Sequence, residues 1–165
     1  MTVGNGDGNS VVAGDVVPRN GSGDGNPILI YAVVAEADRR YLDRLKMHLA
    51  MPIKKGALRI VDDRDIRPGA LTADARWRWC QEARVILYFV SADLFSCGID
   101  LDALVDNHKQ ARHIPVMVRN AYGLQDYAIG SKVKLPRSGG CLSDQGEIDS
   151  RCTEVAKDLR ATLGV

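Results

Sequence analysis

The chain has 165 residues, of which 45% are hydrophobic and 26% are charged, which suits one globular domain with a tail. The formal net charge is +1, so the broadly basic surface that binds nucleic acid is not expected. No apolar run approaches the roughly 18 residues that a membrane-spanning helix needs.

The cysteines and histidines give no sign of a metal site or a disulfide framework. None of the four cysteines is spaced as Cys-x-x-Cys. The N-terminus also lacks the basic and apolar regions of a secretory signal, so we expect reduced thiols in a cytoplasmic protein. The three histidines have no metal-ligand spacing with one another or with the cysteines, which argues against zinc.

Residues 1–27 differ from the rest of the chain. They are rich in Gly, Asn, Asp and Ser, and Gly-Asp-Gly-Asn occurs twice, at 6–9 and 23–26. Such a segment buries too little apolar surface to order itself as a monomer, so we predict a disordered arm. A linker or cloning remnant, a tether to an upstream domain, and a self-assembly motif all stay open. The last resembles short amyloid signalling motifs, and its candidates for cross-β stacking are Val11, Val12, Val16 and Val17.

Residues 28–165 have the pattern of one α/β domain. The near-continuous apolar runs at 28–34 and 85–90 are typical of strands buried on both faces. Strands and helices alternate with short connections, which indicates a parallel sheet covered by helices on both faces. In chain order we expect strands at 28–34, 57–61, 85–90 and 114–118, and helices at 38–49, 70–83, 100–112 and 148–163.

The connections after the first three strands are the place to look for a site. In parallel sheets, ligands bind outside the carboxyl ends of the strands. The loops at 35–38, 62–69 and 91–98 therefore share one edge of the sheet. Their polar residues Glu36, Asp38 and Ser91 are the candidates for a ligand crevice.

Three segments in this order resemble the Toll/interleukin-1 receptor (TIR) domain family of bacterial type. They are Asp62-Asp63-Arg64-Asp65-Ile66-Arg67-Pro68-Gly69, the stretch 83–93 that ends in Ser-Ala-Asp, and Ile114-Pro115-Val116-Met117-Val118-Arg119. The resemblance covers nearly all of 28–163. It implies a flavodoxin-like, doubly wound parallel sheet of about five strands with helices on both faces.

Some members of this family cleave NAD with a glutamate on the third helix, and that residue is missing from this chain. A count from Ser91 without a gap places the family's glutamate position at Leu104, and the substitute candidate is the nearby Asp102. The first loop reads Val-Val-Ala-Glu at 33–36, where the family has hydroxyl side chains. Both departures favour a catalytically weak or inactive domain.

Two other motifs favour structural roles. Trp79-Cys80-Gln81-Glu82 resembles the family's WCxxE signature, but it precedes the third strand instead of following it. The acids at 62–65 resemble a response-regulator pocket, yet that family needs its acidic pair after the first strand and an aspartate at the end of the third. A receiver domain is therefore excluded.

The preferred interpretation is a TIR-like signalling module that acts by homotypic self-association in bacterial immune or stress signalling. Expected partners are the chain itself, other TIR-like domains or an upstream sensor, with homo-oligomers on activation and no cofactor, nucleic acid or membrane. The alternative is an NAD-cleaving effector with NAD as substrate, and a third is a nucleotide-binding regulator without turnover. The predicted interface loop comprises Asp63, Arg64, Asp65, Ile66, Arg67, Pro68 and Gly69.

Overall fold

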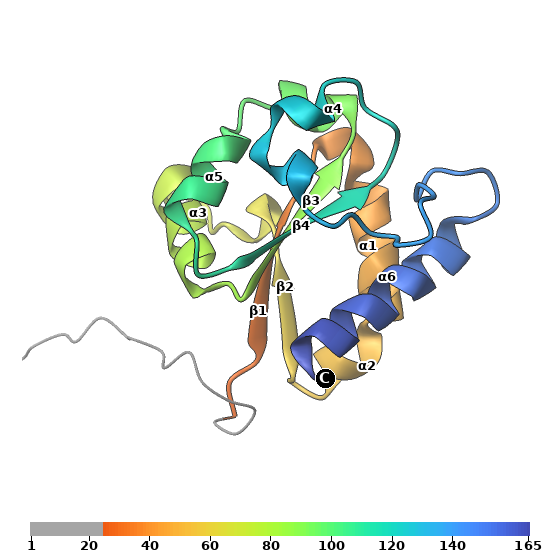
Figure 1. The fold of residues 1–165 in the computed structure, drawn as a ribbon. Helices are drawn as coiled ribbons and strands as arrows, with labels where there is room; N and C mark the ends of the chain where they lie inside the picture. Colours follow the sequence, from red (N-terminus) through yellow and green to blue (C-terminus); the bar gives the residue numbers. More distant parts are fainter. Residues whose placement is uncertain (1–24) are drawn as a thin grey trace, which may run out of the picture.

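A four-stranded parallel sheet lies at the centre of the part of the chain that the computed structural model describes, residues 25–165 (Figure 1). Its order is β2-β1-β3-β4, which confirms the predicted α/β class and parallel topology. The expected fifth strand is reduced to one parallel bridge between Leu135 and Val116. The strands are β1 (Ile28–Val33), β2 (Leu58–Val61), β3 (Val85–Val90) and β4 (Arg112–Met117).

The helices follow the predicted alternation, with three differences. The predicted helix at 100–112 stops at Asn107, because the chain turns so that the Ala111 amide donates to the carbonyl of His108. The expected loop at 91–98 contains a short helix that Ser91 caps, and a further short helix that was not expected, at 50–54, follows the first long helix. The helices are α1 (Arg39–His48), α2 (Ala50–Lys54), α3 (Thr72–Glu82), α4 (Ala92–Ser96), α5 (Leu101–Asn107) and α6 (Ile148–Leu163).

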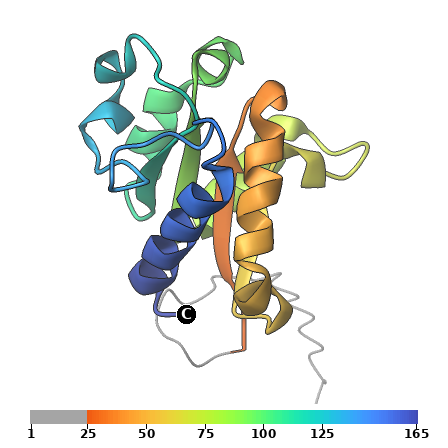
Figure 2. The same ribbon diagram turned by 90° about the vertical axis from the view of Figure 1, so that its right-hand side faces the viewer.

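The sheet separates two helical layers, because successive residues of β1 point to opposite faces. Ile30 and Ala32 pack against α1 and α6, which lie side by side in Figure 2. Tyr31 and Val33 pack against α3, α4 and α5 on the other face. All six residues of β3 are buried, as its uninterrupted apolar sequence predicts.

The strand register aligns the carboxyl ends that carry the candidate site. Ile30 of β1 pairs with Ile60 on one side and with Val85 on the other. The loops that follow β1, β2 and β3 therefore leave the sheet at the same edge. Short 3-10 turns continue two of them, η1 (Glu36–Asp38) and η2 (Asp63–Asp65), and two more, η3 (Leu124–Asp126) and η4 (Ala128–Ser131), follow β4.

Candidate functional site

Asp38 and Ser91, two of the three predicted crevice residues, meet at the carboxyl edge of the sheet. Asp38 is fully buried, and its carboxylate accepts a hydrogen bond from the hydroxyl of Ser91. Its other oxygen, Oδ1, accepts from Nη1 of Arg119 at 2.5 Å. The hydroxyl oxygen of Ser91 also accepts from the amide of Leu94, so it caps α4. This carboxylate is therefore already occupied by protein partners.

Arg119 is a site residue that the sequence analysis did not single out. It lies just beyond β4, at the same edge as the three predicted loops, and its guanidinium is 5.6 Å from the centroid of the Tyr41 ring. The signal that could have found it is this position after the fourth strand. A cation there can compensate a buried carboxylate from the first loop.

Glu36, the third predicted crevice residue, lies at the surface in a charged cluster. It accepts from Nε of Arg39 at 3.0 Å and also pairs with Arg64 of the next loop. The hydrogen bonds from Arg64 and then from Arg39 lower the pKa of the Glu36 carboxyl. Glu36 thus connects the first loop to the second and is no free acid in a crevice.

The 62–69 loop begins with a carboxylate that is held inside the protein. Asp62 is 3% exposed, pairs with Arg39, and lies 3.3 Å from Nζ of Lys46. Burial by itself would raise its pKa, but the hydrogen bonds from Arg39 and from the amide of Arg64 bring it below the ordinary value. The Asp62 amide in turn donates to Oδ2 of Asp65 at 2.9 Å, which completes a capping box around η2.

A second anchor joins this loop to β1 and α3. The hydroxyl of Tyr31, which is fully buried in β1, donates to Oδ1 of Asp63 at 2.7 Å. Nη2 of Arg76 in α3 donates to Oδ2 of Asp63 at 2.6 Å. Burial, and then the hydrogen bond to Asp63, raises the pKa of Tyr31 far above its ordinary value, so the hydroxyl stays a donor. Neither Tyr31 nor Arg76 was predicted as a site residue.

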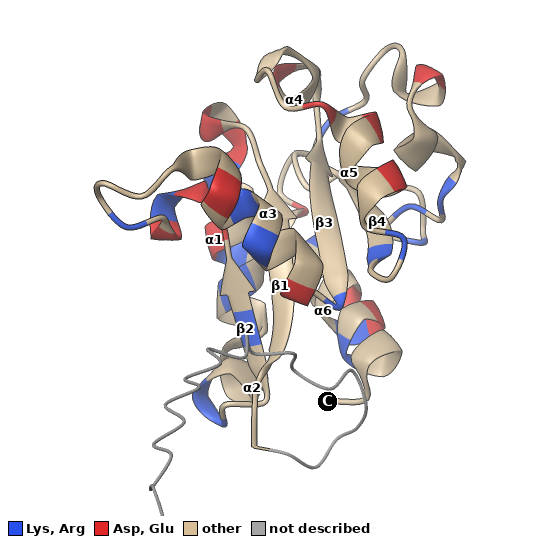
Figure 3. Ribbon diagram, turned by 90° about the vertical axis from the view of Figure 1, so that its left-hand side faces the viewer, with Lys and Arg blue, Asp and Glu red and all other residues tan. Residues whose placement is uncertain are grey.

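Beyond the two anchors, the loop extends away from the body of the domain (Figure 3). Arg67 and Pro68 are exposed, Ile66 is half-buried, and Leu71 is 72% exposed. Gly69 has φ +85°, a conformation that side-chain-bearing residues resist. The fixed base and the exposed tip give this loop the form of a preorganised contact element.

The two positions considered for NAD cleavage lie outside the crevice. Leu104 is 9% exposed and belongs to the apolar cluster beneath α5. Oδ1 of Asp102 accepts the amide of Ala128 at 2.8 Å, so this carboxylate holds η4. Glu82 of the WCxxE-like motif ends α3 as an exposed residue, at the opposite end of the helix from the 62–69 loop.

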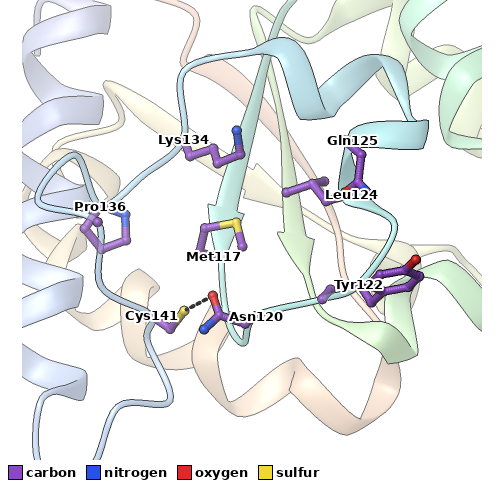
Figure 4. A pocket seen from close by; sticks show the side chains of 10 residues that line it. Met117, Asn120, Tyr122, Leu124, Gln125, Lys134, Pro136 and Cys141 are labelled. Carbon is purple, nitrogen blue, oxygen red and sulfur yellow. Dashed lines mark hydrogen bonds between the residues drawn. The ribbon is translucent and has the colours of Figure 1, made fainter.

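A separate hollow of about 590 Å³ lies beyond the end of β4 (Figure 4). Met117, Leu124 and Pro136 contribute apolar lining, and Lys134 stands at its wall. The thiol of Cys141 lies 3.7 Å from Oδ1 of Asn120 inside it. None of the predicted site residues lines this hollow.

Residues 25–165 also lack two kinds of site. No group of three or more His, Cys, Asp or Glu side chains in this part of the chain could hold a metal ion. Nor does it contain a helix with the length and apolar character that crossing a membrane requires. The four valines proposed for self-assembly lie in 1–24, outside the described residues.

Comparison with known proteins bears on the fold. No protein-family model and no curated protein matches the chain. Among solved structures that match is the crystal structure of the TIR domain of the Toll-related receptor TRR-2 from the lower metazoan Hydra magnipapillata. It is 17% identical, with a TM-score of 0.52, and the match covers 79% of this chain and 97% of that one. The described domain therefore has the fold of a TIR domain, as the sequence resemblance implied.

Proposed function

We propose that this chain is a TIR-type signalling module that acts by homotypic self-association in bacterial immune or stress signalling, without cleaving NAD. The observation that carries this proposal is the construction of the 62–69 loop. Its first residues are bonded to three separate elements, whereas its tip makes few contacts. A loop built in this way is suited to docking against another domain.

The loop's anchors reduce the entropic cost of binding. Asp62 is held by α1 through Arg39, and Asp63 is held by β1 and α3 through Tyr31 and Arg76. Pro68 fixes one backbone angle at the tip. Because little freedom remains to be lost on docking, more of the contact energy contributes to affinity.

The bonding of the candidate carboxylates to other groups of the protein supports the non-catalytic part of the proposal. Cleavage of NAD needs a carboxylate that stabilises positive charge on the ribose as nicotinamide leaves. Leu104 cannot do so, Asp102 is bonded to a backbone amide, and Asp38 is bonded to a serine and an arginine. NAD itself therefore enters only as the substrate in a test.

The interface is tested by sedimentation velocity of the full chain at several concentrations. Pro68→Ala and Ile66→Asp should each weaken self-association and leave the circular dichroism spectrum unchanged. Matched controls are Pro27→Ala and Val133→Asp, since both residues are exposed and lie outside the loop. If both loop variants sediment like the wild type, this loop is not the interface.

The catalytic question needs its own assay. Concentrated protein incubated with NAD should release no nicotinamide above a heat-inactivated sample. Turnover that Asp102→Ala abolishes would show that Asp102, two residues before Leu104 on α5, supplies the acid, and it would refute the inactive assignment. Turnover that Asp38→Asn abolishes would place the reaction at the carboxyl edge instead.

A further inference from the structure

We propose that the domain has a second contact with its own kind, in which the basic amino end of the sheet of one copy binds the acidic α4–α5 flank of another. Neither surface includes the 62–69 loop. The inference therefore goes beyond the proposed function and can be tested separately from it. We define the basic end as Lys54, Lys55, Arg59, Arg84 and Arg112, and the acidic flank as Asp93, Asp100, Asp102 and Asp106.

The sheet itself assembles the three arginines of the basic end. Arg59 of β2 pairs with Leu29 of β1, whose carbonyl accepts the amide of Arg84 at 2.9 Å. The carbonyl of Arg84 accepts the amide of Arg112 at 3.0 Å. Since neighbouring strands are about 4.8 Å apart, the backbones of these arginines span roughly 15 Å of the amino edge. The register places Arg59 and Arg84 on the face that α3 covers and Arg112 on the face that α1 and α6 cover. No single stretch of sequence reveals this row.

Two lysines extend the same surface. Lys54 ends α2 and Lys55 follows it, just before β2 begins. All five cations of the basic end are exposed, and among the described residues none has an ion-pair partner. Glu82 at the end of α3 lies in the same region, but the cations outnumber it. The basic end is thus an uncompensated positive surface.

The acidic flank has the opposite character. The sequence from 85 to 108 contains no lysine or arginine, and its aspartates are carried by α4, α5 and the turn between them. Asp93, Asp100 and Asp106 are exposed, and Asp93 has a single cation within reach, Arg119 at 3.9 Å. Figure 3 shows acidic positions over α4 and α5 and basic ones towards the lower end of the sheet.

Charge complementarity selects a second copy as the partner. The net charge of +1 means that neither charge is in large excess over the whole chain. A second copy satisfies both surfaces, whereas a polyanion would satisfy the basic end alone. Complementary potentials of this kind set the register of association and its rate. Because the two surfaces differ, the contact is heterologous and can extend into chains or close into rings.

Paired charge reversals test this contact in the full chain. The basic-end variant is Arg59→Glu with Arg84→Glu, and the flank variant is Asp93→Lys with Asp106→Lys. Each should weaken self-association roughly tenfold or more at low salt, and added salt should weaken the wild type in the same way. Mixed together, the two variants should associate again, because each reversed surface meets a surface of opposite charge on the other variant.

The same measurements in an Ile66→Asp background separate the two contacts. Charge-dependent association that persists in the Ile66→Asp background supports this inference, whether or not the 62–69 loop is also an interface. Wild-type self-association that is insensitive to salt and to both reversals would overturn it. So would a mixture of the two variants that does not associate although each variant melts like the wild type. Binding of the wild type to heparin or to phosphatidylserine vesicles, combined with an absence of charge-dependent self-association, would assign the basic end to a polyanion instead.

Discussion

Replacing Tyr31 with phenylalanine isolates the anchor beneath the 62–69 loop. The buried hydroxyl donates to Asp63 at 2.7 Å and accepts from Nε of Arg76 at 3.1 Å, so the substitution removes both bonds and keeps the ring. Hydrogen bonds to charged groups contribute about 1.5–3 kcal/mol, but Arg76 still pairs with Asp63 in the variant. We therefore expect the free energy of unfolding near neutral pH to fall by about 1–2 kcal/mol.

The difference in the free energy of unfolding between the wild type and Tyr31→Phe should depend on pH. Burial, followed by the bond to Asp63, raises the pKa of Tyr31 in the folded state. A group whose pKa is raised by folding makes its full contribution to the free energy of unfolding below its pKa in the unfolded state, which is about 10 for tyrosine. That contribution is lost as the pH rises further. At about pH 11, ionisation of the unfolded tyrosine alone removes about 1.4 kcal/mol from the wild type. The difference between the two proteins should then shrink to nearly zero.

Urea unfolding in reducing buffer, near neutral pH and at about pH 11, measures this difference. Burial also raises the pKa of Tyr88 and raises the pKa of Cys80 to about 12, but both groups are present in the two proteins and cancel. Tyr122→Phe is the matched control, since Tyr122 is 98% exposed, and it should match the wild type at both pH values. A difference for Tyr31→Phe that stays constant or grows with pH would refute the reasoning.

Three further outcomes are expected. Arg119→Ala leaves the buried Asp38 with Ser91 as its side-chain partner and should cost about 2–3 kcal/mol, measured by urea unfolding against Arg40→Ala. Burial lowers the pKa of His108 and His113, so stability should be flat above about pH 6.5 and fall below it, and glutamine at both positions should flatten that fall. A peptide covering 5–20 should form thioflavin-positive fibrils if the arm assembles, and a peptide that stays monomeric even when seeded would reduce the arm to a linker.

Local patterns were enough to predict the fold. The buried run at 85–90 and the alternation of strand and helix signals indicated a parallel sheet, and β3 and its neighbours confirm it. The segment at 120–146 gave no clear pattern, because it is made of short turns and one bridge that depends on β4. The helix at 100–112 was extended too far, since a turn at His108 is closed by tertiary contacts that a helical pattern does not reveal.

The site was predicted only in part for a related reason. Strand order placed Asp38 and Ser91 at one edge, and they are indeed bonded. Arg119 and Arg76 were missed because their partners lie far away in the sequence, and arginines are common at the surface. A rule that lists charged residues just beyond every strand would have found the first, but Arg76 lies within α3.

Pro115 in β4 explains how this sheet ends. The carbonyl of Pro115 accepts a hydrogen bond from the Leu135 amide, and the Met117 amide donates to the Leu135 carbonyl. These backbone groups of β4 therefore point away from β3, toward the open edge of the sheet. A backbone N–H at position 115 would also point away from β3. Its absence in proline therefore removes no hydrogen bond between β3 and β4. The ladder therefore stops after one bridge, and an incoming strand finds no continuous row of donors on this edge. Backbone pairing between two copies of the domain at β4 is thereby disfavoured, which leaves any recognition at this edge to side chains.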